Sequence, residues 1–299
     1  MRLLRAATLT AADIDRSSAV YQRWLDYEVV EASLVSELQA LAWDAPAVAG
    51  ARQVTLQPAS GTGIYLRFIE QPIHPDYVPL RTYGWAAIEL CTTDVLAVNE
   101  RMLESPDFEI IGPPREIEGL SAIFPMQVRG PDGEIVYLTE IRDNLPDFHL
   151  PRAKSLIDHL FILVMAASDF SLSTQWLAKY AGLQVGRERM DIVYTMIANA
   201  FDLPVDDLHS ISTLIHEKDV FIEVDQYPPA ATPRPRLDGW LPPGIAIGTL
   251  WHPGFASLAD AGAAQAIGEP ALQPGCIYND RPAVTLRDPD GTLVEIVAN

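Results

Sequence analysis

The spacing of apolar residues along the chain predicts a strand, an amphipathic helix and further strands, in an order that recurs. Residues 3–10 form an apolar run of strand length. Residues 13–24 then place apolar side chains at helical spacing behind Asp13, a typical N-cap. Residues 27–31 and 64–70 are predicted as the next strands of this unit. Such a unit leaves one apolar sheet face uncovered, so it needs a partner to bury that face.

The same order of elements returns three more times. In the second half, residues 157–165 are a predicted strand, and Ser168 or Asp169 caps the helix that follows. The remaining two units begin with predicted strands at residues 85–91 and 245–250. Helices are predicted behind them at residues 94–103 and 255–263. The chain therefore consists of four strand–helix–strands units.

Two segments interrupt this pattern. Residues 142–151 are polar and punctuated by proline at the midpoint of the chain, which indicates a boundary between two halves. Residues 227–244 are rich in proline, which predicts an extended connection rather than a helix or a central strand. That connection either links domains or forms a lid over a site.

Composition narrows the class of protein. A chain of 299 residues suggests two domains or one large one. The formal net charge of −19 argues against nucleic acid or an anionic membrane as a partner. Cys91 and Cys276 are too few for a disulfide framework, so we expect a protein of the reducing cytoplasm. The longest apolar run, residues 160–167, is far too short to span a bilayer.

A Pro-Asp-Gly turn followed by an apolar run occurs twice, at residues 131–138 and 289–297. Proline presets φ and glycine tolerates positive φ, so each copy predicts a tight turn into a strand. Glu295 lies on a strand face otherwise occupied by apolar side chains, where a carboxylate is costly to bury unless it is paired or bound to a metal. Tyr137 stands at the corresponding place in the first copy and is predicted to be a core or pocket aromatic.

The turn and strand at residues 288–295, together with the strand start at 157–160, resemble the vicinal oxygen chelate superfamily, the glyoxalase, bleomycin-resistance and extradiol-dioxygenase group. The resemblance extends over essentially the whole chain. It implies an α+β fold of four βαβββ modules paired into two domains, each a curled mixed sheet around a cavity with helices outside. Residues 1–142 would be an N-terminal domain with a degenerate site, 143–155 a linker, and 156–299 a C-terminal domain holding the active site.

In this family, metal ligands come from the first and last strands of a module. The resemblance therefore implies His159, Glu223 and Glu295 as ligands of one divalent ion, with Glu295 and Tyr278 as catalytic groups. One imidazole and two carboxylates suit Fe²⁺, Mn²⁺, Zn²⁺ or Mg²⁺. A bound ion would hold vicinal oxygens of a small-molecule substrate, aromatic or carbonyl-bearing. The expected reaction is proton abstraction beside a carbonyl, by an isomerase, epimerase or lyase, with oxygenase-like chemistry as a further option.

A second reading is a metal-free member that acts on, or sequesters, a hydrophobic small molecule. Ala246 or Ile247 stands where a second histidine of the dioxygenase pattern would fall, which favours this reading. A homodimer is compatible with either reading, because such modules often pair across subunits. The candidate substrate-pocket residues are Trp176, Trp240, Trp251 and Arg281, and core packing is the structural alternative for the tryptophans.

Each candidate ligand also has a purely structural interpretation. His159 follows Asp158 and would then be a hydrogen-bonded structural histidine. Glu295 would pair with Arg281 or Arg287, since buried charges are normally paired. Glu223 would lie on an exposed edge strand.

Overall fold

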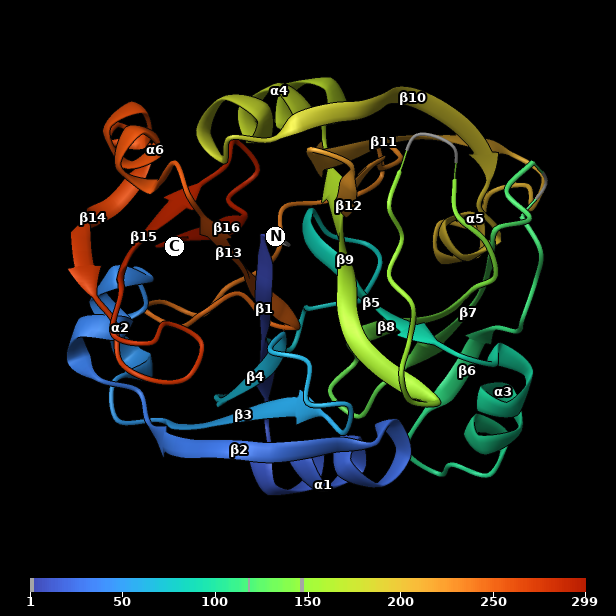
Figure 1. The fold of residues 1–299 in the computed structure, drawn as a ribbon, viewed down its shortest axis with the longest axis horizontal. Helices are drawn as coiled ribbons and strands as arrows, with labels where there is room; N and C mark the ends of the chain where they lie inside the picture. The colour runs from blue at the N-terminus through green and yellow to red at the C-terminus, as the bar shows by residue number, and fades with distance from the viewer. Residues whose placement is uncertain (1–2, 118, 146–147) are drawn as a thin grey trace.

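Each predicted unit is present as a complete module in the computed structural model, which describes residues 3–117, 119–145 and 148–299 (Figure 1). The first module contains β1 (Leu4–Ala11), α1 (Ile14–Leu25), β2 (Tyr27–Leu34), α2 (Glu37–Ala42), the 3-10 helix Pro46–Val48, β3 (Arg52–Pro58) and β4 (Tyr65–Glu70). The second contains β5 (Gly84–Thr92), α3 (Val95–Leu103), β6 (Glu109–Gly112), β7 (Ile123–Arg129) and β8 (Ile135–Ile141).

The third and fourth modules repeat this order. The third contains β9 (Ile157–Ala167), α4 (Phe170–Tyr180), β10 (Gln184–Val193), α5 (Thr195–Ala200), β11 (Leu208–His216) and β12 (Asp219–Gln226). The fourth contains β13 (Ile245–His252), α6 (Phe255–Gly262), β14 (Ala266–Leu272), β15 (Pro282–Arg287) and β16 (Leu293–Ala298). The predicted caps Asp13 and Asp169 each accept a backbone N–H of the first helical turn, which confirms those two helix starts.

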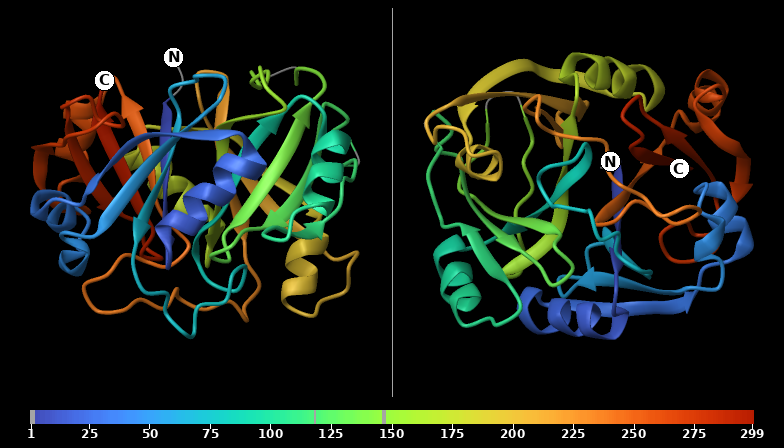
Figure 2. Two further views of the ribbon diagram at one scale, coloured as in Figure 1. Left: turned by 90° about the horizontal axis from the view of Figure 1, so that it is seen from below. Right: turned by 180° about the vertical axis from the view of Figure 1, so that it is seen from behind.

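The modules combine into two eight-stranded mixed sheets, but not by halves of the chain. The first sheet has the order β14-β15-β16-β13-β1-β4-β3-β2, so the first and last modules share it. The second sheet has the order β10-β11-β12-β9-β5-β8-β7-β6 and joins the two middle modules. The antiparallel junctions are β1 with β13 and β5 with β9. Figure 2 shows the blue and red ends of the chain together on one side.

The expected pairing of modules within residues 1–142 and within 156–299 is therefore wrong at the level of the sheets. Every module offers the same kind of apolar first strand as its free edge, so the hydrophobic pattern does not specify which other module that edge meets. The proline-rich segment 227–244 forms neither a helix nor a central strand, as predicted; it is irregular with several turns and connects the second sheet to the first. Among the described residues no helix is both long and apolar enough to cross a membrane.

A shared hydrophobic core lies where the sheets and helices meet. Gly248 of β13 lets the sheets approach closely, because a Cβ there would lie 2.8 Å from the ring of Trp85 and 2.7 Å from Leu163. The Trp85 indole N–H donates to the Leu293 carbonyl at 2.8 Å, which ties β5 to β16. The outer helices cover the remaining apolar strand faces (Figure 2).

The two Pro-Asp-Gly turns connect one sheet to the other. Asp132 accepts hydrogen bonds from the Ala12 N–H and the Ser17 hydroxyl beside the start of α1. Asp290 accepts from the N–H and the hydroxyl of Ser168, just before α4. The aspartate of this conspicuous motif therefore has a structural role in both copies, joining modules that belong to different sheets.

Each sheet curls around an interior face that does not contact the other sheet. We call the face inside the first sheet the first cup and the face inside the second sheet the second cup. Separate hydrophobic clusters fill them: Trp43, Ile69 and Ile247 lie in the first cup, and Tyr137, Val164 and Ile211 lie in the second. Any buried polar side chain in these cups is therefore a candidate functional group.

Candidate functional site

Each cup brings one side chain from each of its four central strands to corresponding positions. In the first cup the strand register pairs Thr8 with Arg67 and Thr249 with Glu295. In the second cup it pairs Glu89 with Tyr137 and Val164 with Glu223. These strands are the first and last of their modules, from which the family resemblance draws metal ligands.

The first cup contains a buried polar network centred on Arg67, which is 1% exposed. Its guanidinium donates twice to the Thr8 hydroxyl, at 2.7 and 3.0 Å, and once to the Tyr278 hydroxyl oxygen at 2.8 Å. Tyr278 in turn donates to Glu295 at 3.0 Å. The guanidinium also lies 4.6 Å from the centre of the Trp43 ring.

Glu295 accepts two further hydrogen bonds in this network. The Trp43 indole N–H donates to its Oε1 at 3.0 Å, and the Thr249 hydroxyl donates to its Oε2 at 2.9 Å. Burial, followed by the charge of Glu295, raises the pKa of Tyr278, while the charge of Arg67 opposes that shift. The predicted neighbours Tyr278 and Glu295 are therefore together, but in a closed and hydrogen-bonded core.

The first cup does not fit a metal ion. Three neutral donors already occupy Glu295, and an indole N–H has no lone pair with which to bind a cation. The positive charge of Arg67 stands at one of the four positions from which a ligand would project. The pairing of Glu295 with Arg281 or Arg287 is also wrong, because Arg281 bonds the C-terminal residues and Arg287 bonds Asp44.

The second cup holds three carboxyl groups, Glu89, Glu223 and Asp225, instead of a balanced network. Burial raises the pKa of Glu89 to about 8, with the charge of Glu223 adding to the shift and the Thr139 hydroxyl, 2.5 Å away, opposing it. Burial and then the charge of Glu223 raise the pKa of Asp225. Burial likewise raises the pKa of Glu223, although hydrogen bonds from Asp225 and Tyr194 oppose the shift.

Asp225 is the least satisfied of these groups. It is 1% exposed, and among the described residues no N–H or O–H donor reaches either of its carboxylate oxygens. It forms a hydrogen bond with Glu223 only when one of the two carboxyls carries a proton. A buried carboxylate without a donor is costly, so this position favours a proton or a cation.

Two tyrosines and an accessible wall complete the cluster. The hydroxyls of Tyr137 and Tyr194 hydrogen-bond to each other, and Tyr194 also reaches Glu223. Glu223 keeps some solvent-accessible surface although protein surrounds it, as expected for a side chain on the wall of a hollow. It does not lie on an exposed edge strand, because β12 is paired on both sides, with β9 and β11.

The second cup fits a divalent cation better than the first. Glu223 and Asp225 project from the same face of one strand, and no positively charged group contributes to the pKa of either, or of Glu89. Among the described residues, the carboxylate oxygens of Glu89, Glu223 and Asp225 do not all lie close enough to one another to form a complete metal site in advance. Two of them, with water or substrate oxygens, would hold the ion. Carboxylate oxygens suit Mg²⁺ or Mn²⁺.

His159 lies at the other end of the second cup. Its side chain is 6% exposed. His159 lies near the start of β9, five residues before Val164, and Val164 is the residue that pairs with Glu223. Five strand residues span roughly 16 Å, so His159 and Glu223 do not converge. His159 instead hydrogen-bonds to Asp158, with Nδ1 3.1 Å from the carboxylate, and its ring lies beside Cys91.

Cys91, Asp158 and His159 bring their potential metal-binding atoms within 4.8 Å of one another. The Cys91 sulfur is 3.7 Å from Nδ1 and 4.0 Å from Nε2, so it contacts the two ring nitrogens at similar distances. Burial opposes ionisation of Asp158, but hydrogen bonds from His159, Ser60 and the Lys154 N–H lower its pKa to about 2. The geometry is that of a hydrogen-bonded structural histidine.

The three predicted ligands therefore do not form one site. Glu295 belongs to the first sheet, whereas His159 and Glu223 belong to the second, at different levels. The corresponding carboxylate of the first module, Glu70 at the end of β4, lies on the face opposite Arg67 and pairs with Arg52 at 3.6 Å.

The predicted pocket residues are dispersed. Trp176 packs in the core between α4 and the second sheet, 5.5 Å from Tyr180. Trp240 packs against the first cup. Trp251 is stacked between Arg5 at 4.0 Å and Arg281 at 4.6 Å. None of these residues lines the hollow beside Tyr227 or the hollow beside Arg234.

Solved structures of other proteins share this arrangement of modules. No protein-family model matches the sequence, and no curated protein does. Among solved structures, maize glyoxalase I is similar over 100% of this chain and 92% of its own, with a TM-score of 0.67 at 15% identity. A putative dioxygenase from Bacillus subtilis is similar over 99% of this chain and 85% of its own, with a TM-score of 0.63 at 12% identity.

The chain has the vicinal oxygen chelate fold. The predicted α+β architecture of four βαβββ modules is thereby confirmed. At these identities the likeness establishes the fold but not the activity, which depends on the side chains in the two cups. Within this vicinal oxygen chelate fold, the first cup contains the buried guanidinium of Arg67, whereas the second cup contains three buried carboxyl groups.

Three residues of these cups were not predicted from the sequence: Arg67, Glu89 and Asp225. Glu89 and Asp225 carried the same signal that singled out Glu295, a carboxylate on an otherwise apolar strand. The sequence alone matches Glu70 to Glu223, because Phe68-Ile69-Glu70 is similar to Phe221-Ile222-Glu223. The strand register instead makes Arg67 the counterpart of Glu223, so nothing in the sequence indicated Arg67.

Proposed function

We propose that the protein is a small-molecule enzyme whose active site is the second cup, with Glu223 and Asp225 at its centre. The observation that supports this most is the orphaned carboxylate of Asp225, buried beside a second carboxyl that solvent reaches. The reaction proposed is proton transfer at a carbon next to a carbonyl, as in an isomerase, epimerase or lyase. The proposed active site therefore excludes Glu295 and Tyr278, the catalytic groups expected from the sequence.

The chain's own groups suit proton transfer. A general base is most effective when its pKa lies near the working pH, and burial moves the pKa of Glu223 upward in that direction. Asp225 holds or shares the proton that Glu223 takes up, and Tyr194 is placed to hydrogen-bond the same carboxyl. A divalent cation, when bound by these carboxylates, would supply Lewis-acid polarisation of substrate oxygens.

Metal binding is tested with Mn²⁺ alone, followed by electron paramagnetic resonance at pH 8. We expect about one Mn²⁺ per chain in the wild type, and loss of binding in Asp225→Asn. Glu295→Gln is the matched control, because it neutralises a buried carboxyl of the other cup. If Glu295→Gln abolishes binding and Asp225→Asn does not, the site lies in the first cup and the proposal is wrong.

Proton transfer is tested by exchange into D2O. Acetoin and benzoin, two 2-hydroxy ketones of different size, are incubated with the protein, and loss of the C–H proton signal is followed by NMR. We expect exchange to fall at least tenfold in Glu223→Gln. Exchange that persists in that variant, or is absent from the wild type with and without Mn²⁺, would contradict the proposed reaction.

A metal-free enzyme is the second candidate, and the proton shared between Glu223 and Asp225 favours it. In that case exchange would proceed in the presence of EDTA at an unchanged rate. The Mn²⁺ titration and the exchange assay together distinguish the two candidates.

A further inference from the structure

A hollow of about 450 Å³ opens at the end of the second cup, next to the carboxyl pair. It is formed by the start of β11, the segment after β12, the turn before β11 and the residues before β5 and α4. Its volume falls within the range of small-molecule sites. The lining residues are Tyr83, Ser168, Leu203, Asp207, Leu208, His209, Ser210, Gln226, Tyr227, Pro228 and Pro229.

The hollow continues the second cup in register. Ile211 of β11 pairs with Asp225 of β12, so two residues further on His209 is level with Tyr227. Two strand residues span roughly 7 Å, about the length of one six-membered ring with its substituents. The charge of Asp225 contributes directly to the raised pKa of Tyr227, after burial, which places the phenol beside the carboxyl pair. A ring bound against Tyr227 would therefore reach from His209 to Asp225.

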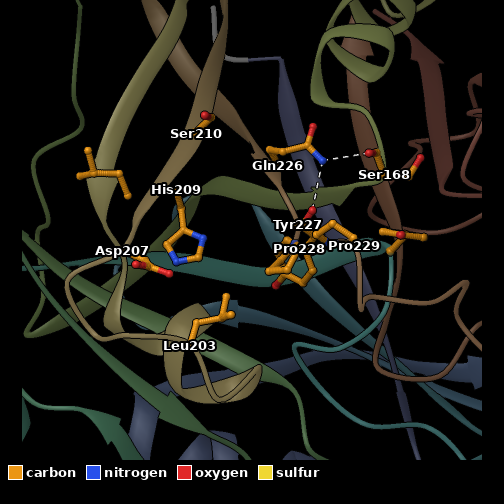
Figure 3. A pocket seen from close by; sticks show the side chains of 11 residues that line it. Ser168, Leu203, Asp207, His209, Ser210, Gln226, Tyr227, Pro228 and Pro229 are labelled. Carbon is orange, nitrogen blue, oxygen red and sulfur yellow. Dashed lines mark hydrogen bonds between the residues drawn. The ribbon is translucent and has the colours of Figure 1, made fainter.

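His209 is the uncommitted polar group of this hollow. It is 7% exposed, and its buried Nε2 has no hydrogen-bond partner among the described residues. Figure 3 shows its ring between Asp207 and Tyr227, above Leu203. By contrast, Gln226 is fully engaged: its side chain donates to the carbonyls of Ser168 and Tyr227 and accepts from a backbone N–H of α4.

The side chains that line the hollow favour an uncharged ligand. Burial lowers the pKa of His209, so its imidazole is neutral at neutral pH and offers a hydrogen bond rather than a positive charge. The carboxylate of Asp207 and the carboxyl pair of the second cup repel anions. Prolines, leucines and tyrosines supply the rest of the wall. The hollow therefore suits an uncharged, flat molecule with a hydroxyl or carbonyl group.

We propose that this hollow binds the substrate as an uncharged, oxygen-bearing ring compound, and that His209 determines specificity by hydrogen-bonding one of its oxygens. The proposal rests on the proposed function, because it places the other end of the ring at Glu223 and Asp225.

The test uses two probes of one skeleton: naphthalene-2,3-diol, which is neutral, and 3-hydroxy-2-naphthoate, which is anionic. Their dissociation constants are measured by fluorescence titration in EDTA, so that the result does not depend on metal. We expect the diol to bind at least tenfold more tightly than the naphthoate. His209→Leu should weaken diol binding at least tenfold, and His209→Gln, which retains a donor and an acceptor, should restore part of it.

His252→Leu is the matched control, since His252 is also 7% exposed with an unpartnered Nε2 but lies outside the hollow. It should leave diol binding unchanged, and near-UV circular dichroism checks that each variant is folded. Absence of diol binding up to millimolar concentration, equal binding of the naphthoate, or equal effects of His209→Leu and His252→Leu would overturn the proposal. His209-dependent diol binding without Mn²⁺ binding or proton exchange would show that the proposed function alone has failed.

Discussion

Replacing Arg67 by methionine tests whether the network of the first cup is a structural charge arrangement. The substitution keeps much of the apolar volume but removes three donated hydrogen bonds and the guanidinium that contacts Trp43 and Tyr278. Glu295 would remain buried, at 1% exposure, without a nearby positive charge. Removing one partner of a buried charged arrangement costs about 3–5 kcal/mol. We expect Arg67→Met to lower the free energy of unfolding by about that amount.

The measurement is urea unfolding of four proteins: the wild type, Arg67→Met, Glu295→Leu and the double variant. If the two charges depend on each other through Tyr278, the double variant should lose at least about 1 kcal/mol less than the sum of the single losses. Arg52→Met is the control, because Arg52 pairs with Asp15 at the surface, where solvent screens the charges and the pair contributes little. Additive losses, or an effect of Arg67→Met no larger than that of Arg52→Met, would refute the reasoning.

Two pH dependences follow from the second sheet. Because the pKa of Glu89 is raised from 4.5 to about 8 in the folded chain, its favourable contribution is complete below about pH 4.5 and is lost as the pH rises through about 8. Urea unfolding of metal-free protein from pH 5 to 9 should show a decline to which the other buried carboxyls also contribute, and Glu89→Gln should make that decline smaller by at most about 4–5 kcal/mol. An identical decline in the variant would contradict the assignment. The pKa of Asp158 is lowered from 3.8 to about 2, so its contribution is present above pH 3.8 and lost as the pH falls through 2. Asp158→Asn should cost roughly 2 kcal/mol at pH 7 and little at pH 2, and a loss that is equal at both pH values would argue that the hydrogen bonds do not stabilise the Asp158 carboxylate.

The elements of the fold were predictable because they are local. Helix caps such as Asp13, Asp94 and Asp169 accept hydrogen bonds from the turn they begin, and strand periodicity shows in a few residues. The pairing of modules was not predictable. It depends on which of several similar apolar edges meet, and only long-range contacts such as that of Trp85 with Gly248 distinguish the alternatives.

The site was partly predictable for the same reason. Glu223 lies on the last strand of its module, where the sequence predicts it, and projects into the second cup. Glu295 was identified as needing a partner, and it has partners, but they are Trp43, Thr249 and Tyr278 rather than a metal. Trp43 comes from a short segment after α2, 252 residues away in sequence. No local pattern indicates a contact over that separation.

The pairing of the first module with the last also affects how the chain folds during synthesis. The second sheet can be completed once residue 226 has left the ribosome, whereas β1 meets β13 only after residues 245–252 have emerged. Until then one edge of the first module has no partner, and an open edge strand invites association with other chains. Division of the gene at residues 143–155, the natural place to separate two domains, would cut both sheets through the middle. Neither product would hold a complete sheet, so the two fragments should regain their structure only when they are expressed together.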